Sequence, residues 1–259
     1  MKLKIFQVDA FAEELFQGNP AAVIPLSSWM DENVMQKIAD ENNLSETAFF
    51  VKGNNEYHIR WFTPTTEVDL CGHATLASSF VIFNFIEENI QQIKFTSKRG
   101  NLFVSRKGDL ITLDFPAVRP VEKELNQLVL DCFPVKPIKY FTGNFDLVLF
   151  DSEEFIKNYE PDFELLKKLH QHGVIITAKG RDVDFVSRVF VPNEGINEDP
   201  VTGSAHTMLV PYWANVLNKK SLTAKQVSKR GGKLWLEDNN DRVLISGKAK
   251  LFFVGEIEI

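Results

Sequence analysis

The chain has 259 residues, of which 44% are hydrophobic and 25% charged, and its formal net charge is −6. This composition is ordinary for a globular protein, and the length allows one large domain or two of about 130 residues each. The acidic balance argues against a nucleic-acid surface, which needs a field of positive charge. The basic run at 229–233 is isolated, and we interpret it as a solvent-exposed turn.

Cysteine usage and apolar runs bear on the compartment. The two cysteines, Cys71 and Cys132, predict no disulfide framework and fit a reducing environment. The N-terminus leads into a strand pattern and lacks the apolar block of a signal peptide. No apolar run approaches the ~18 residues that cross a bilayer. The sequence therefore predicts a cytoplasmic protein that does not associate with membranes.

Short strands and amphipathic helices follow one another along the chain. Alternation and β-branched or aromatic content favour strands in most of the first half. The predicted strands are 2–8, 21–25, 47–51, 57–63, 94–96, 101–106 and 109–115. Surface helices are predicted at 31–43 and 161–172, where apolar residues recur at three- and four-residue spacing. The proline-punctuated stretch 116–134 is predicted to join the two halves, with room for a short helix at 122–132.

A second helix in each half is apolar or small nearly all round. These helices are predicted at 74–86 and 205–217. A helix without a polar face must be covered on all sides, and the curved sheet of its own half would cover it. We therefore predict an α+β fold of two pseudo-symmetric halves, each a mixed sheet rolled around a central buried helix. The predicted domains are 1–118 and 119–259.

An internal repeat supports the two halves. Arg60-Trp-Phe-Thr-Pro64 recurs as Arg188-Val-Phe-Val-Pro192, displaced by 128 residues. Ser97-Lys-Arg-Gly100 recurs as Ser228-Lys-Arg-Gly231, displaced by 131 residues. Two weaker matches join 18–19 with 143–144 and 36–43 with 166–173. Four matches in one order, at nearly constant displacement, indicate a duplicated fold.

The two central helices open with glycine and small polar residues. The first start is Asp69-Leu-Cys-Gly72-His73, and the second is Asp199-Pro-Val-Thr-Gly203-Ser204. A helix N-terminus has unsatisfied N–H donors and a positive dipole end, so it binds carboxylate or phosphate. The alternative is that both glycines only turn tight strand-to-helix corners, and the residue pattern leaves the two interpretations open.

Glu46 is the third candidate feature. It is a lone carboxylate that begins an otherwise apolar strand. A partly buried carboxylate has a raised pKa, which suits it to take and return a proton. The alternative is a capping or edge glutamate, and composition does not decide between them.

Other familiar sites are absent from the sequence. It contains neither the GxxxxGK[ST] nor the GxGxxG pattern of nucleotide-binding loops. His170 and His172 lie two apart on a predicted helix, so they point to different faces and make a poor metal pair. Ser204 and His206 lack the elbow of a serine hydrolase. We predict no metal site and no cofactor.

Six ordered motifs resemble the phenazine-biosynthesis PhzF-like family, from about residue 5 to the end of the chain. They are Gln7-Val-Asp-Ala-Phe, Gly18-Asn-Pro-Ala-Ala-Val, Leu44-Ser-Glu-Thr-Ala-Phe, Arg60-Trp-Phe-Thr-Pro, Glu67-Val-Asp-Leu-Cys-Gly-His-Ala-Thr-Leu-Ala and Glu198-Asp-Pro-Val-Thr-Gly-Ser-Ala-His. The resemblance implies a diaminopimelate-epimerase-like fold and a cofactor-independent isomerase. It also implies a homodimer acting on a small carboxylic acid.

The resemblance also implies roles for individual residues. Glu46 would be the acid/base, assisted by Asp199 and His73 in a cleft between the two halves. The substrate would be held at two helix starts and one loop, by Gly72, His73, Gly203, Ser204 and Asn19. We expect Glu46 to move a proton from one carbon to another of a conjugated, carboxylate-bearing skeleton.

Two alternatives remain. Related epimerases and racemases use two cysteines, one from each half. Cys71 lies eleven residues after Arg60, and the same count from Arg188 reaches Asp199, so the thiol pair is incomplete. Cys71 is then a small buried residue at a helix entry, or the protein is an epimerase or racemase that uses Glu46 with Cys71 or Asp199 as the second base. A non-catalytic protein that binds small acids is the other alternative.

Overall fold

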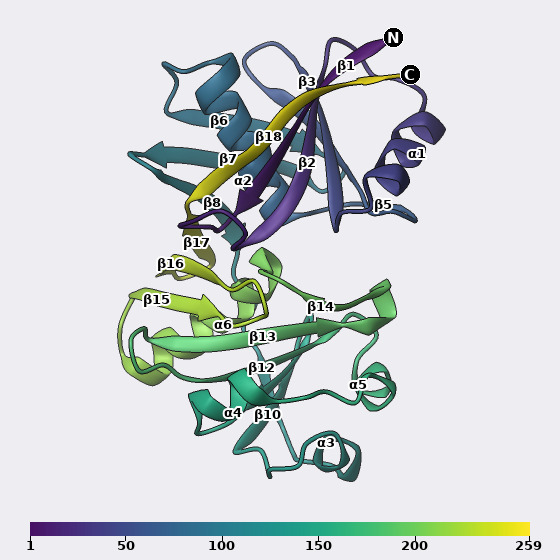
Figure 1. Ribbon diagram of the computed structural model, residues 1–259. Helices are drawn as coiled ribbons and strands as arrows, with labels where there is room; N and C mark the ends of the chain where they lie inside the picture. The colour runs from purple at the N-terminus through teal and green to yellow at the C-terminus, as the bar shows by residue number, and fades with distance from the viewer. The chain divides into compact units, whose positions relative to one another are not determined.

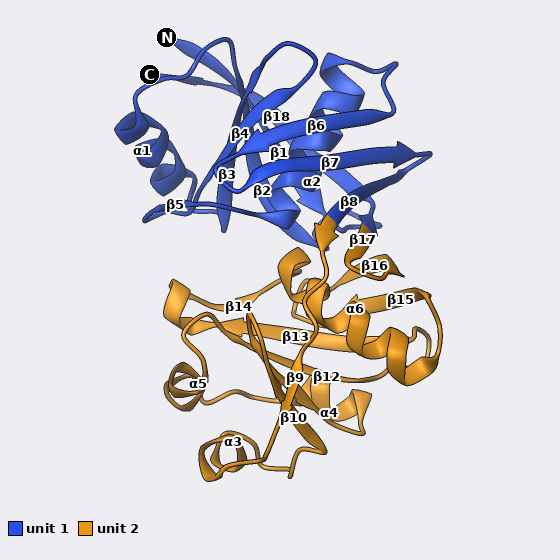
Figure 2. Cartoon of the chain, turned by 180° about the vertical axis from the view of Figure 1, so that it is seen from behind, with its two compact units in different colours: residues 1–114, 246–259 blue, residues 115–245 orange.

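The computed structural model describes all 259 residues, which form two compact units. Unit 1 comprises 1–114 and 246–259, and unit 2 comprises 115–245 (Figure 2). The predicted second domain, 119–259, included the last strand, which the structure places in unit 1. The reason is pairing: β18 (Ala249–Glu258) runs antiparallel to β1 (Lys2–Ala10), from Ala10 opposite Ala249 to Lys2 opposite Glu258 (Figure 1).

Unit 1 is built on a mixed sheet whose strands follow the spatial order β18-β1-β2-β3-β4-β6-β7-β8. The β2–β3 and β4–β6 pairs are parallel, and the other pairs are antiparallel. The short strand β5, which has two residues, pairs with β4. The strand bounds are β2 Asn19–Leu26, β3 Glu46–Lys52, β4 Tyr57–Phe62, β5 Glu67–Val68, β6 Gln92–Ser97, β7 Gly100–Lys107 and β8 Leu110–Pro116.

Unit 2 repeats this pairing in the order β9-β10-β11-β12-β13-β15-β16. Its parallel pairs, β11–β12 and β13–β15, correspond to β2–β3 and β4–β6, and β14 extends β13 as β5 extends β4. The predicted duplication is confirmed. The strand bounds are β9 Val121–Lys123, β10 Lys139–Thr142, β11 Asp146–Leu149, β12 Val174–Lys179, β13 Phe185–Val191, β14 Ile196–Asp199, β15 Ser221–Gln226, β16 Gly232–Asn239 and β17 Arg242–Gly247.

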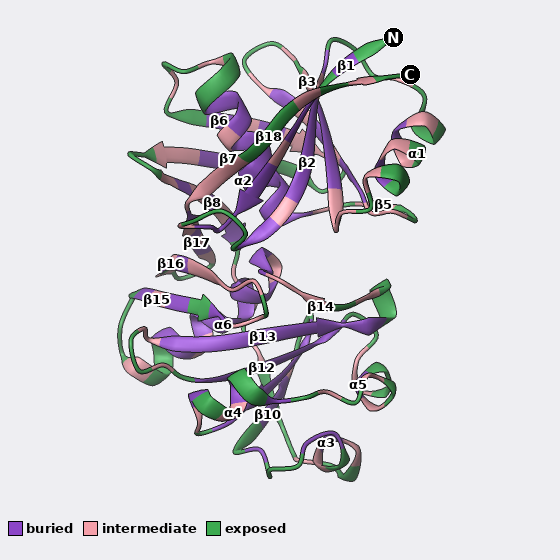
Figure 3. Cartoon of the chain, in the orientation of Figure 1, coloured by how far each residue is buried: buried purple, intermediate pink, exposed green.

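Each unit surrounds one helix. In α2 (Gly72–Val81) every residue but Phe80 is buried, and α6 (Gly203–Leu217) is buried over most of its length (Figure 3). Ser78 and Ser79 are tolerated inside α2 because each hydroxyl donates to the carbonyl four residues earlier. Both helices begin two residues before the predicted starts, so the glycines lie within their first turns. A π-helical turn, η1 (Ile82–Ile86), continues α2.

The surface helices differ from the central pair in how they begin. They are α1 (Glu32–Asn42), α3 (Gln127–Asp131), α4 (Glu153–Asn158) and α5 (Phe163–Leu169). Each is capped by a preceding Asp, Asn or Ser side chain that accepts a backbone N–H. Neither α2 nor α6 has such a cap. The sequence missed α4, which is only six residues long. No helix is both long and apolar enough to span a membrane.

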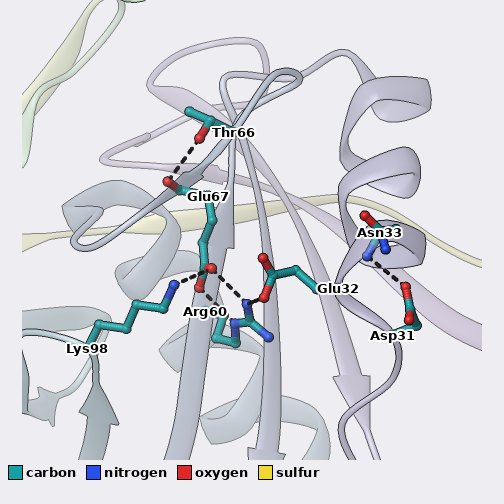
Figure 4. A network of polar contacts seen from close by, with 7 residues as sticks. All are labelled: Asp31, Glu32, Asn33, Arg60, Thr66, Glu67 and Lys98. Carbon is teal, nitrogen blue, oxygen red and sulfur yellow. Dashed lines mark hydrogen bonds and ion pairs between the residues drawn. The ribbon is translucent and has the colours of Figure 1, made fainter.

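An arginine–glutamate pair ties a core strand to the start of the central helix in each unit. In unit 1, Arg60 Nε and Nη2 each donate to one oxygen of Glu67 at 2.7 Å. Figure 4 shows Lys98 on the same carboxylate and Glu32 on the same guanidinium. Hydrogen bonds from Arg60 and then Lys98 hold the pKa of Glu67 below its usual value, although burial opposes them. The pair fixes the backbone five residues before Gly72.

Unit 2 repeats the pair with fewer partners. Arg188 Nε and Nη2 donate to the two oxygens of Glu198 at 2.7 and 2.9 Å. Nη1 of Arg188 donates to the carbonyl of Tyr159 at 2.6 Å. Nearly all the donors of this 9% exposed residue are therefore used within unit 2. We call the Arg60–Glu67 and Arg188–Glu198 pairs the arginine clamps.

Removing the clamp of unit 2 should cost more stability than removing that of unit 1. Arg188→Met leaves Glu198 without its cation, so the free energy of unfolding should fall by about 3 kcal/mol. Arg60→Met should cost about half as much, because Lys98 still neutralises Glu67. Urea unfolding followed by circular dichroism measures both. A loss of under about 1 kcal/mol for Arg188→Met would contradict the assigned role.

Candidate active site

Glu46 and His73 form an ion pair in unit 1. Glu46 is the first residue of β3, and His73 is the second residue of α2. Glu46 Oε2 lies 3.0 Å from His73 Nε2. The side chain of His73 is only 5% exposed, whereas that of Glu46 is 16% exposed. The carboxylate is thus the part of the pair that solvent, or a ligand, can reach.

Asn19 holds the other side of the imidazole. It begins β2, is fully buried, and its Nδ2 lies 3.0 Å from His73 Nδ1. Gly18 precedes it with a φ of +69°, and a Cβ there would lie 2.1 Å from the carbonyl oxygen of Ala10. Only glycine fits this turn. The structure therefore places the predicted substrate residue Asn19 beneath His73, where it fixes the ring.

Burial and charge have opposite effects on His73. Burial alone would lower the pKa of the imidazole, but the neighbouring Cys71 and Glu46 raise it well above its usual value. Burial raises the pKa of the Cys71 thiol to about 11, so the thiol is protonated at neutral pH. The negative charge that favours the imidazolium is therefore that of Glu46.

Cys71 completes the cluster. Its sulfur lies 3.6 Å from Nδ1 and 4.0 Å from Nε2 of His73, and the residue is 6% exposed. It is also the residue before α2, the position that a capping side chain occupies in the surface helices, and it makes no capping bond. The structure thus brings together Asn19, Glu46, Cys71 and His73 at the uncapped start of α2.

In unit 2 the predicted residues surround the start of α6. Asp199 ends β14, and its Oδ2 accepts a hydrogen bond from Thr202 Oγ1 at 2.5 Å. Buried Gln226 donates to the carbonyl of Asp199 at 2.7 Å and accepts from the N–H of Thr202 at 2.9 Å. Gly203 and the half-buried Ser204 begin the helix. Sequence reasoning missed Thr202 and Gln226, and the strand registers place Gln226 where unit 1 has Ser97.

The two helix starts carry different side chains on the same backbone plan. Displacement by 131 residues aligns the clamp glutamates and the two helix glycines. The same displacement aligns Cys71 with Thr202 and His73 with Ser204. Unit 2 therefore has hydroxyl groups where unit 1 has a thiol and an imidazole.

Unit 2 also lacks a counterpart of Glu46. Phe49 and Ile176 stand opposite the clamp arginines in their respective units, which aligns β3 with β12. Three residues before them lie Glu46 and Gly173. A Cβ at Gly173 would meet the carbonyl oxygen of Phe190 at 2.6 Å, so a side chain does not fit there. The duplicated fold therefore carries a carboxylate at this position in unit 1 only.

His170 and His172, which the sequence analysis judged a poor metal pair, lie after the end of α5 and make contacts within a loop. His170 Nδ1 accepts the backbone N–H of His172 at 3.1 Å, and His172 is paired with Glu194. Both histidines line a depression of about 790 Å³ on unit 2 that contains none of the candidate site residues.

The two buried central-helix histidines should titrate in opposite directions. The imidazole of His73 should titrate above its ordinary pKa, because the neighbouring Cys71 and Glu46 raise its pKa although burial lowers it. His206 should remain neutral down to about pH 4, because burial lowers its pKa to about 4. Nitrogen-detected imidazole NMR spectra measure both, and Glu46→Gln should lower only the pKa of His73.

The same shift has a signature in stability. The pKa of His73 is higher in the folded protein than in the unfolded chain. Its contribution to the free energy of unfolding is therefore complete below about pH 6.5 and is lost as the pH rises through the pKa of the folded protein. An imidazole of His73 that is neutral at pH 7 would contradict the pairing.

Comparisons with known proteins identify the family to which the chain belongs. A family model described as phenazine biosynthesis-like protein matches residues 8–255. A Pseudomonas aeruginosa protein named an uncharacterized isomerase is 48% identical over the full length of both chains. A Halalkalibacterium halodurans protein with the same description is 45% identical over 96% of each chain.

Solved structures share the fold. The crystal structure of a PhzF-family phenazine biosynthesis protein from Enterococcus faecalis is 48% identical over all of both chains, with a TM-score of 0.98. A hydroxyproline epimerase from Agrobacterium vitis, at 9% identity, covers 99% of this chain and 92% of its own with a TM-score of 0.63. The predicted fold is confirmed, and the chain belongs to the phenazine biosynthesis-like, or PhzC-PhzF, family.

Proposed function

We propose that the protein is an isomerase that needs no cofactor and moves a proton on a small carboxylic acid, with Glu46 as the base. The observation that carries this proposal is the Glu46–His73 pair at the start of α2. A partly exposed carboxylate is paired with a buried imidazole, whose other nitrogen lies 3.0 Å from the amide nitrogen of Asn19. When the ring is protonated, the Asn19 amide accepts from it by turning its oxygen toward Nδ1. These contacts fix the buried Oε2 and leave the rest of the carboxylate partly exposed. Relatives that are named isomerases support the reaction class.

The uncapped helix starts support a carboxylate ligand. Every surface helix satisfies N-terminal N–H groups with its own side chain, and the two buried central helices do not. Free N–H groups at a helix N-terminus, together with the helix dipole, favour an anion. We propose that the N-termini at Gly72 and Gly203 hold the substrate carboxylate and stabilise the negative charge that develops on the conjugated skeleton.

The proposed proton path uses one base. Glu46 takes the proton from one carbon as the electron pair moves into the conjugated system, and it then returns this proton to another carbon on the same face. The ion pair between His73 Nε2 and Oε2 positions the carboxylate throughout. Asp199, fixed by Thr202 and Gln226, would contact the substrate from unit 2.

Unit 2 has no ionisable side chain at the positions equivalent to Glu46, Cys71 and His73. A two-base epimerase needs a second proton acceptor, and the unit 2 equivalents of Glu46, Cys71 and His73 are Gly173, Thr202 and Ser204. Asp199 is the remaining candidate for a second base. That residues of both units serve one substrate stays a prediction, which a crystal structure with a bound small unsaturated acid would test.

Replacing Glu46 should remove turnover and keep binding. Glu46→Gln preserves the shape of the side chain but removes the base, so the rate should fall by ~10²–10⁴-fold. The assay is proton NMR in D₂O with a panel of small aromatic and unsaturated carboxylic acids, which reports exchange at carbon. Binding is followed separately by the thermal shift that each acid produces.

Glu41→Gln is the matched control, because Glu41 is an exposed glutamate of α1. It should leave exchange unchanged, while His73→Ala and Ser204→Ala should weaken binding and retain some turnover. Near wild-type exchange by Glu46→Gln on an acid that the protein turns over would show that the mechanism is wrong.

The labelling pattern distinguishes an isomerase from an epimerase. An isomerase should move a double bond and carry much of the original hydrogen to the new carbon, because one base takes and returns it. An epimerase with two bases should place solvent deuterium at an inverted centre. Product stereochemistry and deuterium content, measured by NMR on the same acid, decide between them.

A further inference from the structure

Three metal-ligating side chains of different chemistry meet at the start of α2. One ligand atom each from Glu46, Cys71 and His73 lie within 4.8 Å of one another. Two separations define the group: 3.0 Å from Glu46 Oε2 to His73 Nε2, and 4.0 Å from Nε2 to the sulfur of Cys71. The spacing in the sequence does not reveal this cluster, because Glu46 begins β3 whereas Cys71 and His73 lie at the start of α2.

These separations suit a tetrahedral cation. Zinc binds sulfur at about 2.3 Å and nitrogen or oxygen at about 2.0–2.1 Å, so neighbouring ligand atoms of one ion lie roughly 3.3–3.6 Å apart. The observed 3.0 and 4.0 Å fall on either side of this range. Small side-chain rotations would bring all three atoms onto one ion.

The charges also balance. A thiolate and a carboxylate neutralise a divalent cation, and a neutral imidazole adds no charge, which matters where Cys71 and His73 are almost fully buried. On binding, the thiol and imidazolium protons pass to solvent. A ligating imidazole also needs a partner on its other nitrogen. Asn19 stands there, and its amide can accept or donate by a half-turn.

We propose that Glu46, Cys71 and His73 form a binding site for a divalent thiophilic cation such as Zn²⁺, and that the bound cation inhibits the protein. Coordination of Glu46 engages the carboxylate that takes the proton, and coordination of His73 breaks the ion pair that positions this carboxylate. Binding stands on the cluster alone, whereas inhibition rests on the proposed function. The reaction itself uses no metal.

Cobalt(II) is the probe for binding, because a thiolate ligand gives it a near-ultraviolet charge-transfer band. The full-length protein, treated with a chelator and kept reduced, is titrated with Co²⁺. One ion per chain should bind with this band, and Zn²⁺ should displace it. Cys71→Ser should lose the band, and Cys132→Ser, which changes the other buried thiol, should keep it.

Glu46→Gln tests the site if Cys71→Ser does not fold. This variant keeps the thiol, so the band should persist while the affinity falls by more than ~100-fold. The proposal is overturned if the wild-type protein gives no thiolate band. It is also overturned if the band depends on Cys132, or if Glu46→Gln leaves the affinity unchanged.

Exchange measurements separate this proposal from the proposed function. On an acid that the protein turns over in D₂O, Zn²⁺ should abolish exchange and EDTA should restore it. If Zn²⁺ binds at Cys71 without slowing exchange, inhibition is wrong and the proposed function stands. If EDTA itself abolishes exchange, the metal-free reaction is wrong and the cation site stands.

Discussion

In each unit the arginine clamp anchors the backbone that precedes the buried central helix. A buried helix that begins without a capping side chain has unsatisfied N–H groups, and its first turn would fray if nothing fixed the preceding backbone. The two-oxygen pairing of Arg60 with Glu67, and of Arg188 with Glu198, anchors that backbone to a core strand. The clamps therefore allow the helix starts to remain open to a ligand. The position of His73, and through it that of Glu46, depends on this anchoring.

The two units share a backbone arrangement and differ in the side chains at the starts of their central helices. The two units share strand order, parallel pairs, clamps and helix glycines, yet only unit 1 carries the ionisable cluster. In unit 2 the equivalent positions hold hydroxyl groups and Gly173, and buried Gln226 fixes Asp199. Under the proposed mechanism, unit 1 moves the proton and unit 2 offers hydroxyl donors. A base on one side of a substrate is sufficient for a proton shuttle and insufficient for inversion by two bases.

Much of the fold could be predicted, because the repeat and the all-apolar helices constrain it strongly. The sequence could not reveal which unit receives the last strand, since a repeat gives the order of elements and not their closure. It missed α4, because six residues show almost no periodicity. Glu46 was a candidate as a lone carboxylate that begins an apolar strand, and His73 as part of a helix start, and the family resemblance implied their roles. Their contact with Cys71 and Asn19 could not be predicted, because two strands and a helix that are distant in the sequence meet there.

The pairing of β18 with β1 has a consequence for synthesis on the ribosome. All the strands of unit 2 that lie within 115–245 emerge before residues 249–258, so that unit can complete its sheet first. Unit 1 emerges earlier but keeps the outer edge of β1 unpaired until β18 arrives. An open strand edge is a site for association with other chains. The half of the molecule that is made first is therefore the half whose sheet is completed last.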